Sequence, residues 1–153
     1  MPRQQADDYE VCKLSGEEIT LFRALLACFA AAFDEEETYL SAQPGDAYLS
    51  DLLNSRDFVA LAAVHDGKVI GGLAAYVLRK FEQERSEIYI YDLAVDKQHR
   101  RRGIATRLIL DLKALAAARG ISIVFVQADG DDPPAIALYE RFGKREEVLH
   151  FDV

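Results

Sequence analysis

The chain reads Leu93-Ala94-Val95-Asp96-Lys97-Gln98-His99-Arg100-Arg101-Arg102-Gly103-Ile104-Ala105 across the stretch that decides its fold. An apolar run gives way to an arginine cluster, and a helical pattern begins directly after the glycine. A strand, a basic turn and a helix N-terminus in this order form an anion site, because unpaired backbone N–H groups and the helix dipole converge there. We therefore expect a phosphate-bearing ligand at this turn.

The basic turn stands against the charge of the whole chain, which has 18 Lys and Arg against 26 Asp and Glu and a net charge of -8. The simplest alternative is a solvated turn that caps a helix. A localisation or nucleic-acid signal is disfavoured, because the flanks of 99–102 are not basic. The acidic balance also argues against a general nucleic-acid binder and permits a cationic partner.

The 153 residues are half hydrophobic, which predicts one globular domain over 1–153 with a core of its own. No apolar run approaches the roughly 18 residues that a membrane span needs, and Met1–Glu10 is polar. We expect a soluble cytoplasmic protein with no membrane partner. Cys12 and Cys28 are too few for a disulfide framework, so reduced, buried thiols are expected.

Helices and strands alternate along the chain. Helical spacing of apolar residues, a capping box at 15–18 and the glycine at 120 define most of the helices. The predicted helices span 19–33, 46–53, 104–119 and 135–142, and an acidic run, 34–37, follows the first of them.

The strand patterns predict a mixed α/β sheet. The expected strands are 58–64, 69–78, 87–95, 121–127 and a terminal strand, 145–153. Asp66-Gly67 predicts an antiparallel hairpin between the first two. A helix separates 87–95 from 121–127, which indicates a parallel crossover.

The motif around the basic turn resembles the acetyl-coenzyme A signature of GNAT-type N-acetyltransferases, Q/R-x-x-G-x-G/A. Arg100, Gly103 and Ala105 match it, and the segment 135–143 stands where this family has its second motif. The order of elements across nearly the whole chain also fits. The resemblance implies a GNAT-like fold: a mostly antiparallel central sheet with one parallel, splayed strand pair, flanked by helices.

Four further stretches resemble the aminoglycoside 3-N-acetyltransferases of the gentamicin-modifying type: 74–78, 81–83, 86–95 and 145–152. The resemblance implies acetyl transfer to the 3-amino group of the deoxystreptamine ring, with antibiotic resistance as the result. The implied partners are a polycationic aminoglycoside and, through the terminal strand, a second copy in a homodimer.

The resemblance also implies the coenzyme contacts. Backbone N–H groups of 101–106 would cradle the pyrophosphate, with arginine side chains at the rim. Two strands would splay near Leu93, where backbone groups pair with the pantetheine arm and a backbone N–H stabilises the oxyanion. The expected contact residues are Leu93, Ala94, Val95, Arg100, Arg101, Arg102, Gly103, Ile104, Ala105 and Thr106.

Asp92 is the candidate proton acceptor, because it immediately precedes the Leu-Ala-Val strand end. A normal Asp has a pKa near about 4, so it would act mainly in the transition state and hold an ammonium before that. The alternative is a residue that only caps backbone. Glu87 would lie on the opposite face of a regular strand, and a bulge between the two would change that.

Tyr139 matches the family tyrosine that serves the leaving thiolate. Full proton transfer from a phenol to a thiolate is uphill by about 2 kcal/mol, so hydrogen-bond donation is expected. The alternative is a core aromatic in a Leu-Tyr-x-x-Phe stripe.

Acidic clusters are the candidates for binding a cationic acceptor, although most charge runs are solvated surface. Asp131-Asp132 is the best placed, in the loop after the parallel strand, where ligands of open sheets bind. The full set of candidate substrate contacts is Asp34, Glu35, Glu87, Asp131, Asp132 and Glu147. His65, His99 and His150 show no metal-ligand spacing, so no metal is expected.

Two alternatives to this function remain open at the level of sequence. One is a GNAT enzyme that acetylates a polyamine, another small amine or a protein amine. The other is a domain without catalysis that binds coenzyme A as a sensor or interaction module.

Overall fold

Five strands form one mixed sheet within residues 8–153, the part of the chain that the computed structural model describes. In sheet order they are β1 (Glu10–Lys13), β2 (Phe58–His65), β3 (Lys68–Arg79), β4 (Ser86–Val95) and β5 (Ile123–Val126). The first three pairings are antiparallel, and β4 pairs with β5 in parallel. The predicted mixed, mostly antiparallel sheet is confirmed.

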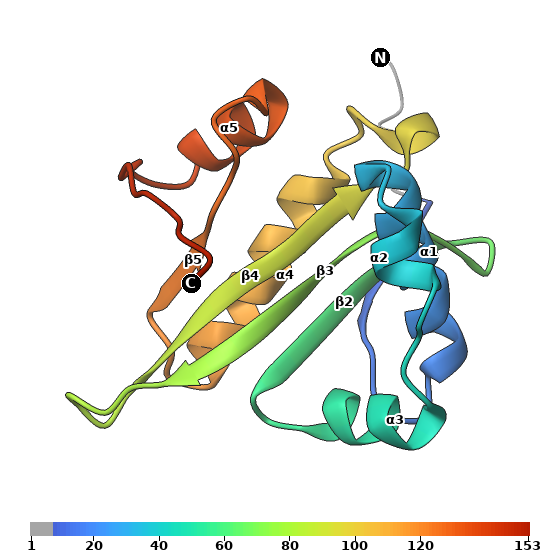
Figure 1. Ribbon diagram of the computed structural model, residues 1–153, viewed down its shortest axis with the longest axis horizontal. Coiled ribbons are helices and arrows are strands. Elements are labelled where there is room, and N and C mark those ends of the chain that lie inside the picture. The colour runs from blue at the N-terminus through green and yellow to red at the C-terminus, as the bar shows by residue number, and fades with distance from the viewer. Residues whose placement is uncertain (1–7) are drawn as a thin grey trace, which may run out of the picture.

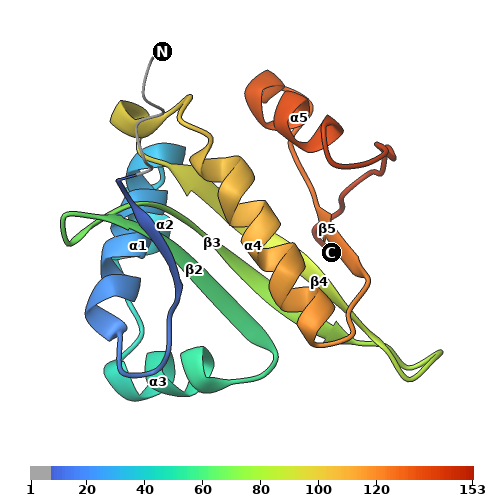
Figure 2. The same cartoon turned by 180° about the vertical axis from the view of Figure 1, so that it is seen from behind.

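Helices cover both faces of the sheet (Figures 1 and 2). On one face lie α1 (Ile19–Phe33), α2 (Glu36–Leu40) and α3 (Asp46–Asn54), and on the other lies α4 (Ile104–Ala118). A single 3-10 turn, η1 (Lys97–His99), precedes α4, and α5 (Pro133–Glu140) follows β5. The four predicted helices are all present within two residues of their expected ends.

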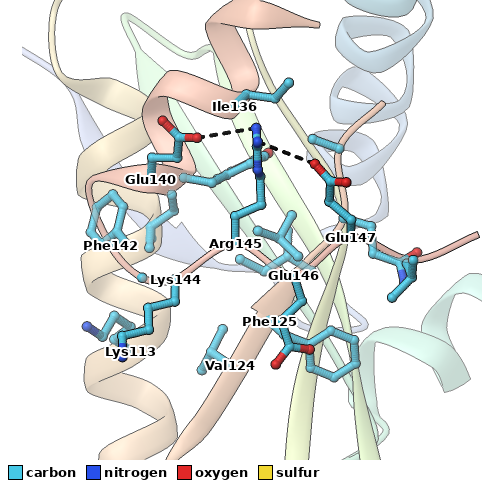
Figure 3. A pocket seen from close by; sticks show the side chains of 18 of the residues that line it. Lys113, Val124, Phe125, Ile136, Glu140, Phe142, Lys144, Arg145, Glu146 and Glu147 are labelled. Carbon is cyan, nitrogen blue, oxygen red and sulfur yellow. Dashed lines mark ion pairs between the residues drawn. The ribbon is translucent and has the colours of Figure 1, made fainter. Parts of the chain in front are cut away.

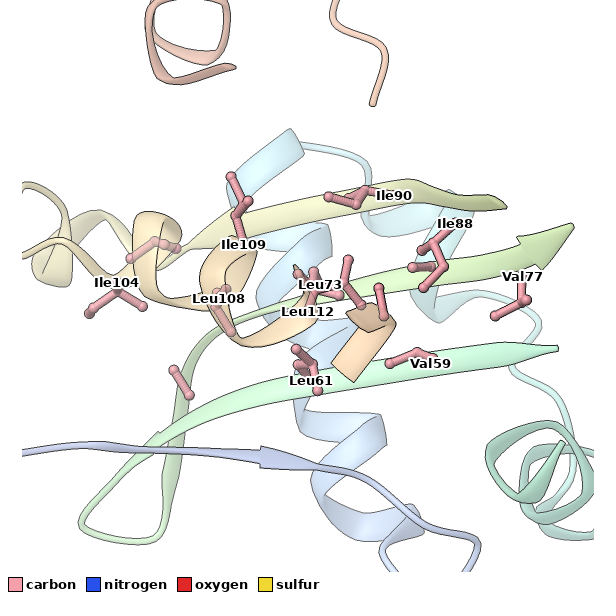
Figure 4. Close-up of a cluster of buried hydrophobic side chains, with 14 of the residues drawn as sticks. Val59, Leu61, Leu73, Val77, Ile88, Ile90, Ile104, Leu108, Ile109 and Leu112 are labelled. Atoms are coloured by element: carbon pink, nitrogen blue, oxygen red, sulfur yellow. The ribbon is translucent and has the colours of Figure 1, made fainter. Parts of the chain in front are cut away.

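The face under α4 holds the larger core cluster (Figure 4). The helix buries residues at helical spacing, among them Leu108 and Leu112, which are fully buried. They pack against alternate residues of β3 and β4, such as Leu73, Ile88 and Ile90. The helix buries a residue at every third or fourth position, and each strand buries every second residue against it. These two apolar faces pack together and fix the position of the helix that follows the basic turn.

The opposite face packs α1 and α3 closely onto the sheet. Phe22, Leu25 and Phe29 of α1 are buried there. A Cβ at Gly72 would stand 2.5 Å from Leu25 Cδ1 and 2.5 Å from Leu61 O, so only glycine lets the helix approach this strand. The glycine therefore sets how near α1, and the chain that follows it, lies to the middle of the sheet.

The β2–β3 hairpin forms as predicted. Asp66 and Gly67 both have positive φ, 48° and 75°, which is the two-residue turn whose twist matches the flanking strands. The expected capping box forms in half: Glu18 Oε1 accepts hydrogen bonds from Ser15 N at 3.2 Å and Ser15 Oγ at 3.0 Å. The helix itself begins later, at Ile19.

Besides the 3-10 turn η1, one strand and one α-helix were not predicted. β1 pairs with β2 from within a polar N-terminal stretch, and α2 occupies the acidic run after α1. Each has only four or five residues, which is too short for a periodic signal.

The predicted terminal strand, 145–153, is wrong: residues 141–153 are in no helix or strand. Val148, Leu149 and Phe151 are exposed. A strand needs a neighbour to take its backbone hydrogen bonds, and in the described chain β5 pairs only with β4. An alternating pattern without a partner strand therefore stays irregular here.

Leu108→Ala should lower the free energy of unfolding by about 2–5 kcal/mol, because it leaves a cavity between α4 and the sheet. Leu110→Ala is the matched control: Leu110 lies on the same helix, is 50% exposed, and should change stability by less than about 0.5 kcal/mol. Urea unfolding followed by circular dichroism measures both. Equal losses would contradict the packing of α4 described above.

Candidate functional site

A β-bulge in β4 organises the candidate site. Ala74 of β3 pairs with Asp92, and Ala75 pairs with Ile90, so Tyr91 is an extra residue without a partner on β3. Ile90 and Val95 face the core under α4, whereas Ala94 faces α1. The bulge thus reverses the alternation and places the side chains of Tyr91 and Asp92 on the same face of the sheet, toward α1 and α2.

The parallel pairing of β4 with β5 ends at the same point. Its register runs from Glu87↔Ile123 to Ile90↔Val126 and goes no further. Residues 91–95 of β4 therefore have no partner on the β5 side, although they still pair with β3. The predicted splay of the two strands is present and leaves one backbone edge open for an extended ligand.

Asp92 makes one short side-chain hydrogen bond on this face. Tyr39 of α2 donates from its hydroxyl to Asp92 Oδ2 at 2.7 Å. Both side chains are half-buried. The contact joins residues 53 positions apart and links the second unpredicted element, α2, directly to the candidate proton acceptor.

The surroundings of Asp92 make its carboxyl a stronger base than an ordinary aspartate. Burial raises its pKa, the Tyr39 hydrogen bond works in the lowering direction, and the negative charge of Glu35 adds a smaller raising effect. The net direction is upward. A carboxylate with a raised pKa is a better proton acceptor and pairs readily with an ammonium.

Tyr139 lies on α5 beyond the end of β5 and is half-buried. Burial raises the pKa of its phenol, and the charges of Asp132 and Asp92 raise it further. The field of Asp92 thus reaches Tyr139, so the structure brings these two predicted residues into one neighbourhood. The higher pKa makes the Tyr139 phenol a weaker acid than an ordinary tyrosine.

The basic turn has the backbone of an anion cradle. Arg101 and Gly103 both adopt positive φ, 62° and 75°, directly before α4. No side chain caps the helix N-terminus, and a Cβ at Gly103 would meet no atom within 4 Å. A backbone that alternates between right-handed and left-handed conformations, followed by the uncapped N–H groups of a helix, is typical of sites that bind phosphate. These residues fit the pyrophosphate of a coenzyme.

The arginine side chains differ in their partners. Arg102 forms an ion pair with Asp8 and a 2.9 Å contact with His99 Nδ1. Arg100 donates through Nε to Val95 O at 3.3 Å, which ties the turn to the end of β4. Arg100 to Gly103 are exposed, Ala105 and Thr106 are half-buried, and Ile104 anchors the helix in the core.

Of the predicted acidic contacts, two lie near the candidate chemistry. Glu35 stands at the N-cap position of α2 without a side-chain capping bond, and it acts electrostatically on Asp92 and Tyr39. Asp132 caps α5, accepting from Ala135 N at 3.3 Å, and acts on Tyr139.

The other predicted acidic contacts are exposed or already paired, and none of them is among the groups that shift the pKa of Asp92 or Tyr139. Asp34 ends α1 in a left-handed conformation and is exposed. Asp131 is exposed in the loop before α5. Glu147 lies 3.4 Å from Arg145 in the C-terminal segment. Of the predicted acidic contacts, only Glu35 and Asp132 thus act electrostatically on Asp92 or Tyr139.

Glu87 lies on the same face as Asp92, because the bulge falls between them. Five strand residues still separate the two by roughly 15 Å. Glu87 Oε2 is 2.6 Å from Arg85 Nη1 and 4.0 Å from Lys80 Nζ, so its charge is already balanced. Glu35 therefore acts on Asp92 electrostatically, whereas Glu87 does not.

Aromatic side chains line the face of the sheet between Glu87 and Asp92, and the sequence analysis did not identify this aromatic cluster. Tyr91 makes edge contacts with Tyr76 and Tyr89, both with centroids 5.7 Å apart, and Tyr89 stacks on Phe125 at 4.9 Å. Tyr76 and Tyr91 are exposed. The period-2 recurrence of tyrosine on β4 was the available signal.

A cavity of about 890 Å³ lies on the other side of β5, between α4, α5 and the C-terminal segment (Figure 3). Arg145 spans its mouth, with Glu140 and Glu147 on either side at 3.5 and 3.4 Å. Tyr139 belongs to its lining, whereas Asp92 and the basic turn do not. The cavity therefore adjoins the candidate site at Tyr139 and does not contain it.

A metal site and a membrane span each place requirements on residues 8–153, and the two cysteines lie within this range. This part of the chain has no group of three or more His, Cys, Asp or Glu placed to hold a metal ion. None of its helices is long and apolar enough to span a bilayer. Cys12 and Cys28 are free and half-buried, and burial raises the pKa of the Cys28 thiol to about 11.

The comparison with protein families decides the identity of the fold. Residues 20–144 match the model of the Acetyltransferase (GNAT) family. The chain belongs to this GNAT family. GNAT acetyltransferases use acetyl-CoA, and the matched range includes the basic turn, the splayed strand pair and α5.

Known proteins agree with this placement. An aminoglycoside acetyltransferase from an uncultured soil metagenomic sample has 60% identity and a TM-score of 0.93, over 95% of this chain and 97% of that one. A second such enzyme, also from soil, was crystallised with sisomicin; it has 32% identity and a TM-score of 0.88, over 95% of each chain.

A curated relative is more distant in extent. The mycothiol acetyltransferase of Clavibacter michiganensis subsp. michiganensis (strain NCPPB 382) is 36% identical over 79 residues. The match spans 52% of this chain and a quarter of that protein. The shared part is thus a segment of a longer enzyme.

Asp92→Asn should leave the melting temperature at pH 7 unchanged or raise it. A folded-state pKa above the unfolded value means that the charged form is less stable in the folded protein, so the penalty grows as pH rises above about 4. The amide removes the charge and keeps an oxygen for Tyr39. Thermal unfolding at pH 7 and pH 4 should show a difference that shrinks at the lower pH; a clear loss of stability at pH 7 would contradict the direction of the shift.

Proposed function

We propose that this GNAT protein transfers the acetyl group of acetyl-CoA to an aminoglycoside, at the 3-amino group of the deoxystreptamine ring. One observation carries the proposal: the bulge sets Asp92 at the start of the open edge of β4. The basic turn lies at the far end of that edge. The similarity to two aminoglycoside acetyltransferases supports this class of acceptor.

The open edge and the basic turn would hold the coenzyme. Backbone groups of Leu93, Ala94 and Val95 would pair with the extended pantetheine arm. The N–H groups of 101–106 would bind the pyrophosphate, and Arg100, Arg101 and Arg102 would add positive charge at its rim. The thioester would then lie near the start of the open edge, beside Asp92.

The reaction would be a direct transfer. The acceptor nitrogen, as the neutral amine with its lone pair free, attacks the thioester carbonyl carbon, a C–N bond forms, and the C–S bond breaks to release the coenzyme thiolate. Asp92 accepts the proton that the nitrogen loses, directly or through water, as the new bond acidifies it. A backbone N–H of the open stretch would stabilise the oxyanion.

Tyr139 would serve the leaving group. Its phenol would donate a hydrogen bond to the departing sulfur, which stabilises the thiolate without full proton transfer. The raised pKa of Tyr139 makes full proton transfer to the sulfur less favourable, which is why we assign it hydrogen-bond donation only.

The acidic surface near Asp92 would bind the cationic acceptor. Glu35 acts electrostatically on Asp92 and Asp132 acts on Tyr139, and Asp34, Glu87, Asp131 and Glu147 would act at longer range. Acetylation removes one positive charge and one donor from the drug. That loss would weaken binding to an anionic RNA target and confer resistance.

We propose that the protein is cytoplasmic. We also propose that it forms a homodimer. The C-terminal segment leaves Val148, Leu149 and Phe151 exposed beside the cavity. A second copy would cover such an apolar surface and supply the strand partner that the segment lacks.

Purified protein should release coenzyme thiol from acetyl-CoA in the presence of gentamicin or sisomicin. Asp92→Asn should lower kcat/KM for the drug by about 100- to 10,000-fold, the usual range for loss of a general base. Tyr139→Phe should lower kcat by roughly 10-fold or more, because one hydrogen bond to the thiolate is lost. The dissociation constant for coenzyme A should change less than threefold in either variant.

The outcomes separate the alternatives. Turnover of a polyamine or a peptide amine without turnover of an aminoglycoside would remove the acceptor assignment and keep the GNAT reaction. Coenzyme binding without turnover of any amine, and without an effect of either substitution, would identify a coenzyme sensor.

The dimer has its own test. Sedimentation equilibrium should give twice the 17.1 kDa chain mass. Phe151→Asp should shift the protein toward monomer, because it places a charge in the covered surface. Tyr48→Phe, which alters an exposed residue of α3, is the control. A monomeric unmodified protein would overturn this part of the proposal.

A further inference from the structure

We propose that Tyr39 is the positioning residue of this site: its hydroxyl holds Asp92 Oδ2 so that Oδ1 stays available to the acceptor amine. The inference rests on the proposed function, because it assumes that Asp92 receives the amine proton. It concerns a residue of α2 that the sequence did not single out.

The geometry gives Tyr39 a fixed place. Its ring packs against Phe29 and Phe33 of α1, with centroids 5.9 and 6.1 Å apart. Phe29 is buried in the core under α1. The hydroxyl is therefore held at the end of an aromatic cluster, and its direction toward Asp92 does not depend on a flexible side chain.

The same cluster explains how α2 keeps its position. The helix has five residues, and none of them is buried. A helix this short is not stable by itself and depends on tertiary contacts. Tyr39 supplies such contacts on both sides, with aromatic packing toward α1 and the 2.7 Å hydrogen bond toward β4.

Donors and acceptors match the proposed role. An ionised carboxylate only accepts hydrogen bonds, and its two oxygens accept from different directions. Burial and the Asp92 charge raise the pKa of Tyr39, so its hydroxyl remains a donor throughout the working range of pH. The ammonium or amine of an acceptor can thus use Oδ1 while Tyr39 keeps Oδ2.

Tyr39 also limits how far the surroundings raise the pKa of Asp92. Its hydrogen bond favours the charged carboxylate, against burial and Glu35. Other groups in electrostatic contact with Asp92 come from β3, β4 and α5. They are Tyr76, Tyr89 and Tyr139, and Tyr91 interacts with Tyr39. The raised pKa values of Tyr76, Tyr89 and Tyr139 keep these phenols neutral at neutral pH, so Tyr39 and Glu35 dominate the polar field at the carboxylate.

Tyr39→Phe tests the inference with little risk to the fold, because the ring and its packing remain. The substitution should raise the pKa of the Asp92 carboxyl, seen by carbon-detected NMR titration of the protein without substrate. The acid limb of the profile of kcat/KM against pH should move to higher pH by roughly 0.5 to 1 unit. We expect kcat to fall about 10- to 100-fold, as for a misplaced catalytic group, with KM for acetyl-CoA unchanged.

Two controls separate positioning from a general structural effect. Tyr48→Phe removes the hydroxyl of an exposed tyrosine on α3 and should leave both the Asp92 titration and the profile unchanged. In an Asp92→Asn background, Tyr39→Phe should cost less than about twofold in kcat, because the group through which it acts is already lost.

The outcomes are distinct. An unchanged Asp92 titration, or an equal loss of kcat in the two backgrounds, would overturn the role of Tyr39. Absence of turnover with every amine would overturn the proposed function instead, and the substrate-free titration would still decide whether Tyr39 holds the Asp92 carboxylate.

Discussion

One extra residue in β4 connects the core of this protein to its candidate chemistry. Because Tyr91 has no partner on β3, the alternation of β4 reverses after Ile90. Leu93 and Val95 then continue the core under α4, and Asp92 emerges on the face of α1 and α2. In a regular strand, Asp92 would point into the apolar layer under α4, where an unpaired carboxylate is far too costly to persist.

The bulge also explains why the candidate site has two signs of charge. It coincides with the end of the β4–β5 pairing, so one stretch of backbone is open on the β5 side. The far end of that stretch leads into the arginine turn and the free N–H groups of α4, and its near end carries Asp92. Negative and positive groups therefore lie at opposite ends of one short strand segment, in an otherwise acidic chain.

Partial burial of Asp92 has a stability cost that the fold offsets locally. Burial and Glu35 both disfavour its charge, and the Tyr39 hydroxyl stabilises it. An electrostatic cost of this kind is common at functional sites, where a group must be more reactive than the same group in solvent. The aromatic packing of Tyr39 against α1 shows how the cost is spread: core residues hold the donor, and the donor holds the carboxylate.

Local signals were enough to predict α4, the basic turn and the β2–β3 hairpin, since each depends on residues close together in the sequence. The bulge was left open, because Tyr91 fits a regular strand as well as a bulged one. Tyr39 was missed because its partners, Phe29 and Asp92, are separated from it by 10 and 53 positions.

The terminal segment shows the same limit. Leu149, Phe151 and Val153 alternate as a strand would, but alternation describes only one face of an element. A strand also requires a neighbour that accepts its backbone hydrogen bonds. In the described chain β5 pairs with β4 over four residues, and no other strand adjoins it. Runs of apolar, β-branched and aromatic residues thus predicted β2, β3 and β4 correctly, where sheet partners exist, and the prediction failed at 145–153, where the described chain provides no partner strand.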